Sequence, residues 1–554
     1  MSGIAVSSCS DMLTTDTESY INIDDQGAYN ANDSLYSAMG VVRQLQSLGE
    51  RYVLLGELRG DLVEVPTTAD YSLQEISNFE MSADNSFSSR RDYYSVINNC
   101  NFALTKLDTL LQEHNRQVLL KDYVSIRTMR DWTFLQLGLT YGKAAWIEKP
   151  ILTLEDAEKD YPTVGLDEII DNIVADLTPF AGADTSDYGT VDNLPSSRFF
   201  MSPMLLLADL MLYKNNYEEA ARLYYTYLYE NYVTLQSYYG NHWQTSQALA
   251  INASNHLTSY SSETLAIIPY SSDAKDYHPN LVNLTYNTTP SLLPADWWVR
   301  EMKVREHYFA ANEEVPNYSI LEGDTRGEMI VQDNSTASVT DGFNTTGYAM
   351  GLSVPAMIGK FNNNATVCSA VSNPGNPLFE NGNQPIVTMV ATYRVPHVYL
   401  RYAEAANRAG KPTIAFAVLK YGLRNEVLNN ESAPKINAEE RADGARWTNF
   451  EDSRFDSNRG SACRGRGYGV ANASEYSIPQ LATLSDSIEW VENRILEEMA
   501  AETAFEGNRF FDLLRMSRHN QNPDEWFAER VARRFADPAS AKAKLSNSES
   551  RWLK

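Results

Sequence analysis

Apolar residues recur every three or four positions along much of the chain, which is the period of an amphipathic helix. The pattern is clearest in residues 34–50, 91–112 and 117–141. Residues 51–65 and 71–85 contain more Asp, Thr, Pro and Ser, which indicates a looser conformation. The regions that we expect to carry paired helices are about 33–65, 91–141, 203–231, 396–428 and 486–518.

Two of these regions repeat each other. The stretch from Pro203 reads PMLLLADLMLYKNNYEEAARLYYTYL, and the stretch from Val398 reads VYLRYAEAANRAGKPTIAFAVLKYGL, so that Ala208 aligns with Ala403. Each pattern predicts a helix, a tight turn and a second helix, with small residues where the two helices cross. This is the organisation of a tetratricopeptide unit. With a degenerate unit at 91–141, the repeats predict a scaffold of helix pairs.

Three long insertions interrupt this scaffold, at about 232–360, 373–385 and 429–473. The first is rich in Asn, Thr, Ser, Tyr and Trp, and it contains short strand candidates at 264–269 and near 329–332. Pro and Gly repeatedly break the second, which predicts irregular structure. The sequence therefore indicates a mostly α protein of the α+β class, in which the insertions form an irregular lobe.

Charge narrows the range of partners. The formal net charge of the 554 residues is −26, which disfavours nucleic acid and anionic lipid because both need a basic surface. The Arg-Gly run at 464–469 is therefore interpreted as a glycine-rich surface loop. Tyrosines outnumber phenylalanines by 33 to 19, which favours rings that stack and also hydrogen-bond.

The usual templates of catalysis and metal binding are absent. The chain has no HExxH, no GxSxG elbow, no GxxxxGK[ST] loop and no Rossmann glycine motif, and its seven histidines are scattered singly. We therefore expect no enzyme activity, no metal and no cofactor. The many carboxylates leave a hydrolase with two acidic residues as an open alternative.

The N-terminus reads MSGIAVSSC, and its last four residues resemble the lipobox at which a signal peptidase cuts before a lipid-modified cysteine. Cys9 is thus the expected lipidation site. The apolar run before it is shorter than a complete signal requires, so we infer a longer leader. Residues 1–32 are interpreted as signal remnant and tether. The chain contains no run of 18 apolar residues, so we predict no transmembrane helix. The other cysteines, Cys100, Cys368 and Cys463, are expected to be buried thiols.

Residues 495–515 read ILEEMAAETAFEGNRFFDLLR, which predicts a core helix, a break at Gly507 and a second short helix. Acidic and arginine side chains alternate with apolar ones, and they can pair across the break. We expect these charges to hold the fold together without touching a ligand. The residues of this structural signature are Glu502, Glu506, Arg509, Asp512 and Arg515.

The run AFEGNRFFDLLR is similar to the C-terminal signature of the SusD/RagB family of outer-membrane nutrient-binding lipoproteins. LGLTYG and RYAEAANRAG resemble other segments of that family, as do the residues around 324–326 and 359–361. The chain departs from the signature at 499–501, where arginines usually stand, and at Asn508, which replaces a frequent histidine. The resemblance implies one SusD-like domain over residues 33–554, with tetratricopeptide-like helices and a ligand-binding lobe.

The resemblance also implies a function. SusD-like proteins are lipid-anchored at the cell surface of the outer membrane, capture oligosaccharide and deliver it to a SusC-like TonB-dependent transporter. Their ligand lies in a shallow aromatic arc, which in this chain corresponds to residues near 71–87 and 270–298. The ligand-binding candidates are Tyr71, Phe87, Tyr270, Tyr277, His278, Trp297 and Trp298. Because Trp297 and Trp298 are adjacent, they point in different directions and at most one faces a ligand.

Aromatic rings suit a sugar because they stack on the C–H face of its ring while Asn, Gln, Asp or Arg bind its hydroxyls. A second aromatic group, Tyr238, Tyr239, His242 and Trp243, lies in the same insertion. Two alternatives remain open: a peptide-binding member of the same family, and a tetratricopeptide scaffold that binds only proteins. An acidic lining with few exposed tryptophans would favour peptide.

Overall fold

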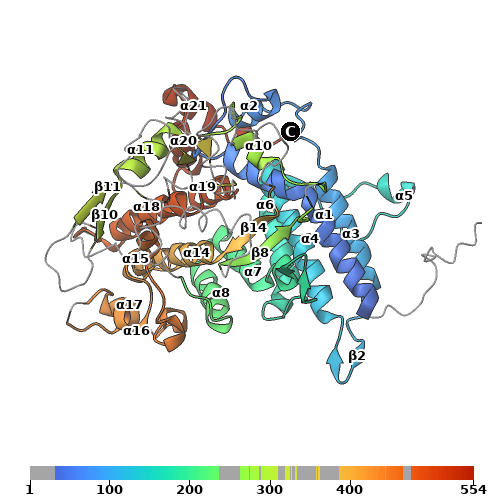
Figure 1. Ribbon diagram of the computed structural model, residues 1–554, viewed down its shortest axis with the longest axis horizontal. Coiled ribbons are helices and arrows are strands. Elements are labelled where there is room, and N and C mark those ends of the chain that lie inside the picture. Colours follow the sequence, from blue (N-terminus) through green and yellow to red (C-terminus); the bar gives the residue numbers. More distant parts are fainter. Residues whose placement is uncertain are drawn as a thin grey trace, which may run out of the picture.

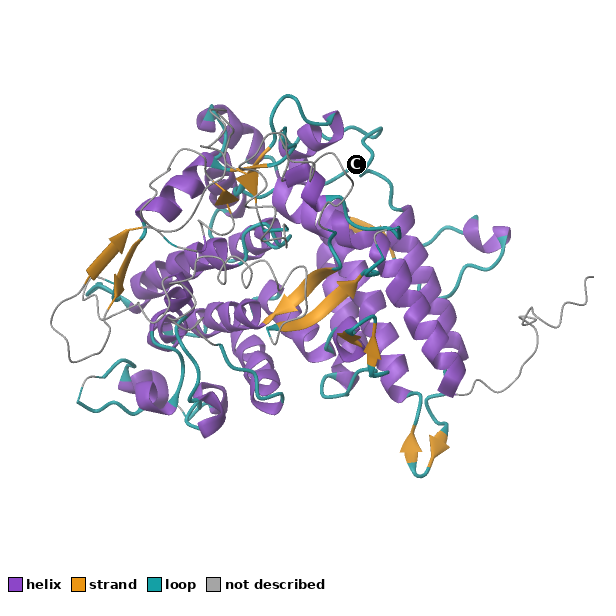
Figure 2. Cartoon of the chain, in the orientation of Figure 1, coloured by secondary structure: helices purple, strands orange, loops and turns teal. Residues whose placement is uncertain are grey.

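The computed structural model shows a mostly helical protein with a few small sheets, which confirms the predicted fold class (Figure 1, Figure 2). The structure describes residues 31–235, 263–273, 275–285, 289–309, 319–322, 324, 326, 331–332, 357–358, 360–361, 386–432, 434–442, 444–465 and 476–554. The predictions for Cys9, Cys368, residues 238–243 and residues 373–385 lie outside these residues. The division into residues 1–32 and one domain stays a prediction.

The helices and strands carry the labels of Figure 1. The α-helices are α1 (Ala31–Leu58), α2 (Tyr71–Ser77), α3 (Arg91–Lys106), α4 (Leu120–Tyr141), α5 (Leu154–Ala157), α6 (Leu166–Leu177), α7 (Pro203–Tyr213), α8 (Tyr217–Glu230), α10 (Leu281–Thr285), α11 (Asp296–Val304), α14 (Val395–Arg408), α15 (Pro412–Lys420), α16 (Asn425–Leu428), α17 (Ala438–Ala442), α18 (Leu484–Glu502), α19 (Arg509–Ser517), α20 (Pro523–Ala532) and α21 (Pro538–Leu545). The strands are β1 (Val63–Glu64), β2 (Gln112–Glu113), β3 (Arg116–Gln117), β4 (Lys143–Ala145), β5 (Thr163–Gly165), β6 (Thr190–Val191), β7 (Leu194–Pro195), β8 (Thr264–Pro269), β9 (Leu293–Pro294), β10 (Glu306–Phe309), β11 (Ser319–Glu322), β12 (Val331–Gln332), β13 (Met357–Ile358) and β14 (Met389–Arg394).

Helices that follow one another in the sequence pack in pairs. α3 packs on α4, α7 on α8 and α14 on α15, and α14 also contacts α8 and α18 (Figure 1). The predicted alanines of the repeats, Ala208 and Ala403 among them, are fully buried. The turn between α7 and α8 places Asn215 at φ +57°, and Gly410 takes φ +85° between α14 and α15. A left-handed residue of this kind suits Asn or Gly and lets the second helix fold back on the first.

The first helix is longer than its pattern predicted. Residues 51–58, expected to be looser, continue α1, and residues 71–77 form α2 with Asp70 as its N-cap. The second half of α1 is buried on every side. Its apolar residues therefore do not repeat along one face of the helix, and the prediction relied on that repeat. Gly56 permits a close approach, because a Cβ there would lie 1.8 Å from the carbonyl oxygen of Gly507.

All strands among the described residues form antiparallel pairs of two. The longest pair joins β8 and β14, which confirms the predicted strand at 264–269. The pairing of β1 with β9 places Val63 opposite Pro294 and Glu64 opposite Leu293. Two segments that are far apart in the sequence, one near α2 and one leading into α11, thereby lie side by side.

Candidate ligand-binding site

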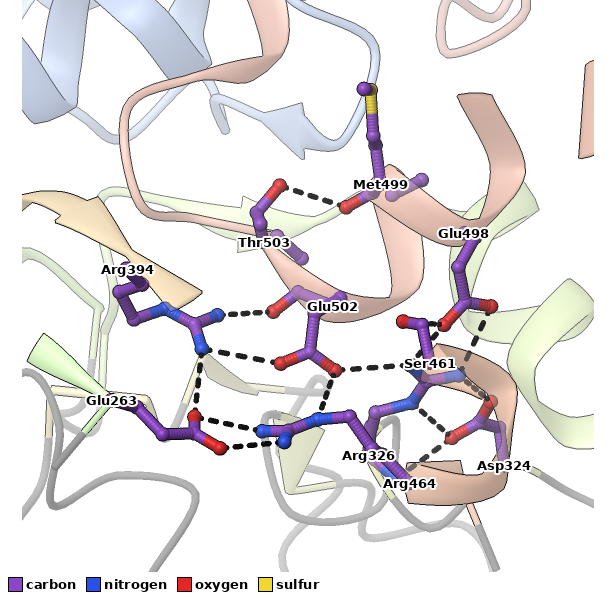
Figure 3. Close-up of polar contacts among 12 residues, drawn as sticks. Glu263, Asp324, Arg326, Arg394, Ser461, Arg464, Glu498, Met499, Glu502 and Thr503 are labelled. Carbon is purple, nitrogen blue, oxygen red and sulfur yellow. Dashed lines mark hydrogen bonds and ion pairs between the residues drawn. The ribbon is translucent and has the colours of Figure 1, made fainter. Parts of the chain in front are cut away.

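The densest group of charges in the described chain surrounds the end of α18 (Figure 3). The carboxylate of Glu502 accepts hydrogen bonds from Arg326 (3.1 Å), Arg394 (3.2 Å) and Arg464 (3.0 Å). Glu498, one turn earlier, accepts from Arg326 at 2.6 Å. Arg394 also forms a two-armed contact with Glu506, both at 2.7 Å. We refer to these residues as the α18 network; its members are Asp324, Arg326, Lys360, Arg394, Arg464, Glu498, Glu502 and Glu506.

Pairing, rather than exposure to water, keeps the α18 network charged. Burial alone would raise the pKa of Glu502, but Arg464, Arg394 and Arg326 outweigh it and lower that pKa below its ordinary value. For Glu498, Arg326 and Arg305 likewise overcome burial and lower the pKa. All of the network side chains are buried. The network is therefore paired within the chain and exposes almost no surface to a ligand.

The predicted signature residues are buried and form ion pairs, mostly with partners that are distant in the sequence. Within the segment, Arg515 donates to Asp512 at 2.8 Å, as the i,i+3 spacing predicts. Arg515 also binds Glu404, and Arg509 binds Asp61. The interpretation of residues 464–469 as a surface loop is wrong for Arg464, which is 1% exposed and paired with Glu263 and Glu502.

An open groove lies between α1, the β6–β7 turn and residues 269–277, with a volume of about 1270 Å³. We call it the α1 groove. Its floor is apolar and includes Val42, Leu194 and Phe199. Its walls are polar: the side chains that line them are Arg43, Gln44, Gln46, Ser47, Asp92, Asp192, Ser271, Ser272, Asp273, Asp276 and Tyr277.

The groove combines one exposed ring with several hydrogen-bonding groups. Tyr277 is 57% exposed, and its ring lies 6.1 Å from that of the buried Tyr270, with 53° between the ring planes. Arg43 and Asp276 are exposed and have no ion-pair partner among the described residues. Asp192 is already bound by Ser272. Such a surface can stack on one ring and bind hydroxyl or amide groups at its edges.

The sequence-predicted candidates differ in exposure. Tyr71, the first residue of α2, is 72% exposed, and Tyr277 is 57% exposed. Phe87 is half-buried beneath the guanidinium of Arg51. The ring nitrogens of His278 lie 3.2 Å from the carbonyl oxygen of Val387 and 2.9 Å from that of Asp273, so both face the backbone. Of the candidates, Tyr71 and Tyr277 present most of their rings to solvent.

Two of the candidates are corrected by their burial. Tyr270 is 2% exposed and donates its hydroxyl to the carbonyl of Gln46 at 2.8 Å. Trp298 is also 2% exposed, and its indole nitrogen donates to the carbonyl of Ala500 at 2.9 Å. Large aromatic side chains supply much apolar area to a core, and their polar atoms then need a partner, which both of these have. Tyr270 and Trp298 are packing residues.

Trp297 occupies a different place from the other candidates. It is half-buried, donates its indole N–H to the carbonyl of Asp61 at 2.6 Å, and carries the guanidinium of Arg533 over its ring at 3.3 Å. It lines a second, smaller pocket beside α18 and α20. The structure thus brings Tyr270 and Tyr277 together, and sets Trp297 apart from them.

Sequence reasoning missed most of the groove. Arg43, Gln44 and Ser47 belong to the first helix, for which the prediction used only the apolar positions. Their polar positions in the same helix could have indicated a surface that binds a ligand. Asp192 comes from a turn that carried no motif. The described residues contain no group of three or more His, Cys, Asp or Glu arranged to hold a metal. None of the described helices has both the length and the apolar composition to cross a membrane.

Comparison with known proteins agrees with this architecture. Residues 324–551 match the SusD family model. A SusD superfamily protein from Bacteroides vulgatus superposes with a TM-score of 0.60 at 14% identity, covering 95% of each chain. A SusD-like carbohydrate-binding protein from Bacteroides fragilis gives 0.55 at 14% identity, over 90% of this chain and 87% of that one.

Surface glycan-binding protein A from Bacteroides fluxus also gives 0.55 at 14% identity, over 92% of this chain and 93% of that one. No curated protein matches the chain. At these identities the structural likeness is one of fold, while the family match rests on the C-terminal sequence. The predicted resemblance is confirmed: the chain is SusD-like in the sequence of residues 324–551 and in its overall fold.

Proposed function

We propose that this protein captures oligosaccharide in the α1 groove without breaking bonds in it. The observation that carries the proposal is the exposed ring of Tyr277, which lies beside the ring of Tyr270 and is bordered by polar side chains such as Gln44 and Asp276. A sugar needs this combination of one flat apolar face and several edge partners. Two of the similar structures are described as carbohydrate-binding or glycan-binding proteins, which supports the same class of ligand.

We further propose that Cys9 carries the lipid that anchors the protein to the cell-surface side of the outer membrane. The partner would be a SusC-like TonB-dependent transporter that receives the bound glycan. Purification of the full chain from detergent-solubilised outer membrane tests both points. A co-purifying TonB-dependent barrel, and a lipid mass on the peptide containing Cys9, are the expected results.

The glycan proposal is tested by substitution of Tyr277. A glycan array identifies the best-bound oligosaccharide, and titration calorimetry then compares wild type with Tyr277→Ala. We expect at least a tenfold loss of affinity, about 1.4 kcal/mol, because the substitution removes the exposed aromatic ring of the groove. Tyr232→Ala is the matched control, since Tyr232 is 69% exposed but does not line the groove. Equal binding by Tyr277→Ala and wild type would reject this site.

A specific observation favours peptide as a second candidate. Four aspartates, Asp92, Asp192, Asp273 and Asp276, line the groove against one arginine, Arg43. No tryptophan is among the exposed large side chains of the described residues. An acidic wall of this kind attracts Lys- or Arg-containing peptides by charge complementarity. Calorimetry with a basic peptide library and with oligosaccharides, at low and at physiological salt, distinguishes the two ligands.

A further inference from the structure

A second pocket lies between α11, α18 and α20, with a volume of about 300 Å³. Its apolar wall contains Trp297, Met302 and Leu496. This volume is at the lower end of what small-molecule sites occupy, and it suits a ligand the size of one sugar ring. The α1 groove shares no lining residue with this pocket.

Arg509 and Arg533 line the pocket and share one buried carboxylate. Asp61 is fully buried and accepts hydrogen bonds from Arg509 at 2.6 Å and from Arg533 at 3.0 Å. One carboxylate thus serves two guanidiniums. Arg533 is exposed at the pocket, and it uses its Nε and Nη2 atoms on Asp61, so that its other terminal nitrogen can donate to a further acceptor.

Arg530 adds a third positive charge at the same pocket. Its guanidinium stacks on Trp526 at 3.6 Å and donates to the side-chain oxygen of Asn493 at 3.1 Å. No carboxylate of the described residues lies within ion-pair distance of it. Burial, followed by repulsion from Arg533, lowers the pKa of Arg530 to about 10, although Glu529 and Asp61 act in the opposite direction.

Three carboxylates also line this pocket, from Glu301, Glu497 and Glu529. Glu301 and Glu529 are exposed, and Glu497 is paired with Arg494. These carboxylates repel a doubly charged phosphate more strongly than a singly charged carboxylate, and they accept hydrogen bonds from hydroxyl groups. A ligand with a single carboxylate at one end and hydroxyls at the other meets both requirements.

We propose that this pocket binds one carboxylate-bearing sugar ring, with its carboxylate against Arg530 and Arg533 and its hydroxyls toward Asn493 and the glutamates. Two planar guanidiniums suit a carboxylate because each offers paired N–H donors. The ring packs along Trp297 and Met302. This second site is independent of glycan capture in the α1 groove, since it uses other residues on other helices.

Calorimetry of the full chain with D-glucuronate and with D-glucose tests the proposal, because these sugars differ at one carbon, which bears a carboxylate or a hydroxymethyl group. We expect glucuronate to bind at least tenfold more tightly than glucose, and its affinity to fall as salt is raised. Arg530→Gln should lose at least tenfold in glucuronate affinity. Arg300→Gln is the matched control, because Arg300 is an exposed arginine on α11 that pairs with Asp296 and does not line the pocket.

Thermal unfolding of both variants shows whether Arg530→Gln retains its fold. Should it fail to fold, the indole N–H signal of Trp297 in the wild-type NMR spectrum gives the answer, since glucuronate and not glucose should shift it. Equal affinities for the two sugars, no binding of glucuronate, or full affinity in a folded Arg530→Gln would overturn the proposal. Tyr277→Ala should leave glucuronate binding unchanged, so failure of this pocket and failure of the groove are separate results.

Discussion

The α18 network and the α1 groove are both rich in polar side chains, but they differ in how those side chains are satisfied. In the network, each carboxylate of Glu498, Glu502 and Glu506 meets at least two cationic groups and is closed off from water. In the groove, Arg43 and Asp276 face solvent without an ion-pair partner among the described residues. The network has its partners inside the chain, while the groove has exposed charged side chains without an ion pair among the described residues.

This difference separates a signature from a site. The sequence run that resembles the family signature, around residues 502–515, lies in the closed region. The residues proposed to bind ligand come from turns without a sequence motif and from the polar face of α1. A dense group of charges therefore does not by itself mark a binding surface, because the charges of the α18 network are buried and paired.

The largest expected effect comes from breaking the network. Glu502→Gln removes the charge shared by Arg326, Arg394 and Arg464, which leaves buried guanidiniums short of a counter-charge. We expect a loss of about 3–5 kcal/mol in the free energy of unfolding, measured by urea denaturation. Glu301→Gln, at an exposed glutamate, is the control and should change stability by about 0.5 kcal/mol or less. A loss below about 1 kcal/mol for Glu502→Gln would contradict the assigned role.

Removal of a packed ring should have a comparable effect, while removal of the open ring should not. The buried ring of Trp298 lies edge-on to that of Phe505, with 5.4 Å between the ring centroids. Trp298→Ala leaves a cavity there, so we expect a loss of about 3–5 kcal/mol in the free energy of unfolding. Tyr277→Ala should lose about 0.5 kcal/mol or less, because its ring is largely in solvent. Denaturant unfolding of both variants measures the contrast. Similar losses for the two would mean that Tyr277 is a packing residue.

Glu57 is a buried glutamate outside the α18 network, and it shows what happens when a buried carboxylate has no ion-paired arginine in the described part of the chain. Burial raises the pKa of Glu57 to about 7, although Gly507 donates its N–H to one carboxylate oxygen, and the other oxygen has no hydrogen-bond partner among the described residues. The folded state thus holds this proton more tightly than the unfolded state, so the contribution of Glu57 to stability falls as pH rises from about 4.5 to about 7.

Glu57→Gln keeps the bond from Gly507 and removes the ionisation. We expect the variant to be more stable than wild type by about 3 kcal/mol at pH 8 and nearly equal to it at about pH 4.5, from unfolding measured at both values. The opposite sign applies to Glu502, whose lowered pKa gives stability that is lost on acidification. A gain in the Glu57 variant that does not depend on pH would contradict this explanation.

The helical scaffold could be predicted because its apolar period is strong. The turns at Asn215 and Gly410, the strand at 264–269 and the break at Gly507 follow directly from local residue preferences. Residues 51–58 were missed because burial on all sides of α1 removes the period. The long-range pairing of Glu502 was missed because its three arginines come from segments that only the tertiary fold brings together.

The candidate site was predictable as a region and poorly predictable by residue. The adjacency of Trp297 and Trp298 predicted that at most one faces a ligand, but it could not show that Trp298 is buried with its indole nitrogen bound to the carbonyl of Ala500. Exposure of Tyr277 depends on α1, which lies far away in the sequence. The groove walls depend likewise on contacts between α1, the β6–β7 turn and residues 269–277, for which no local pattern exists.

The way in which α1 is held has a consequence for biosynthesis. Tyr52, Glu57 and the carbonyl of Leu58 take partners from Asn508, Gly507 and Arg534, 450 or more positions further along. A ribosome that adds about 5–20 residues per second needs roughly 20–90 seconds to reach them. During that interval, the apolar surface of the newly made first helix lacks its final cover and is prone to aggregation, so this chain can complete its fold only at the end of translation or after it.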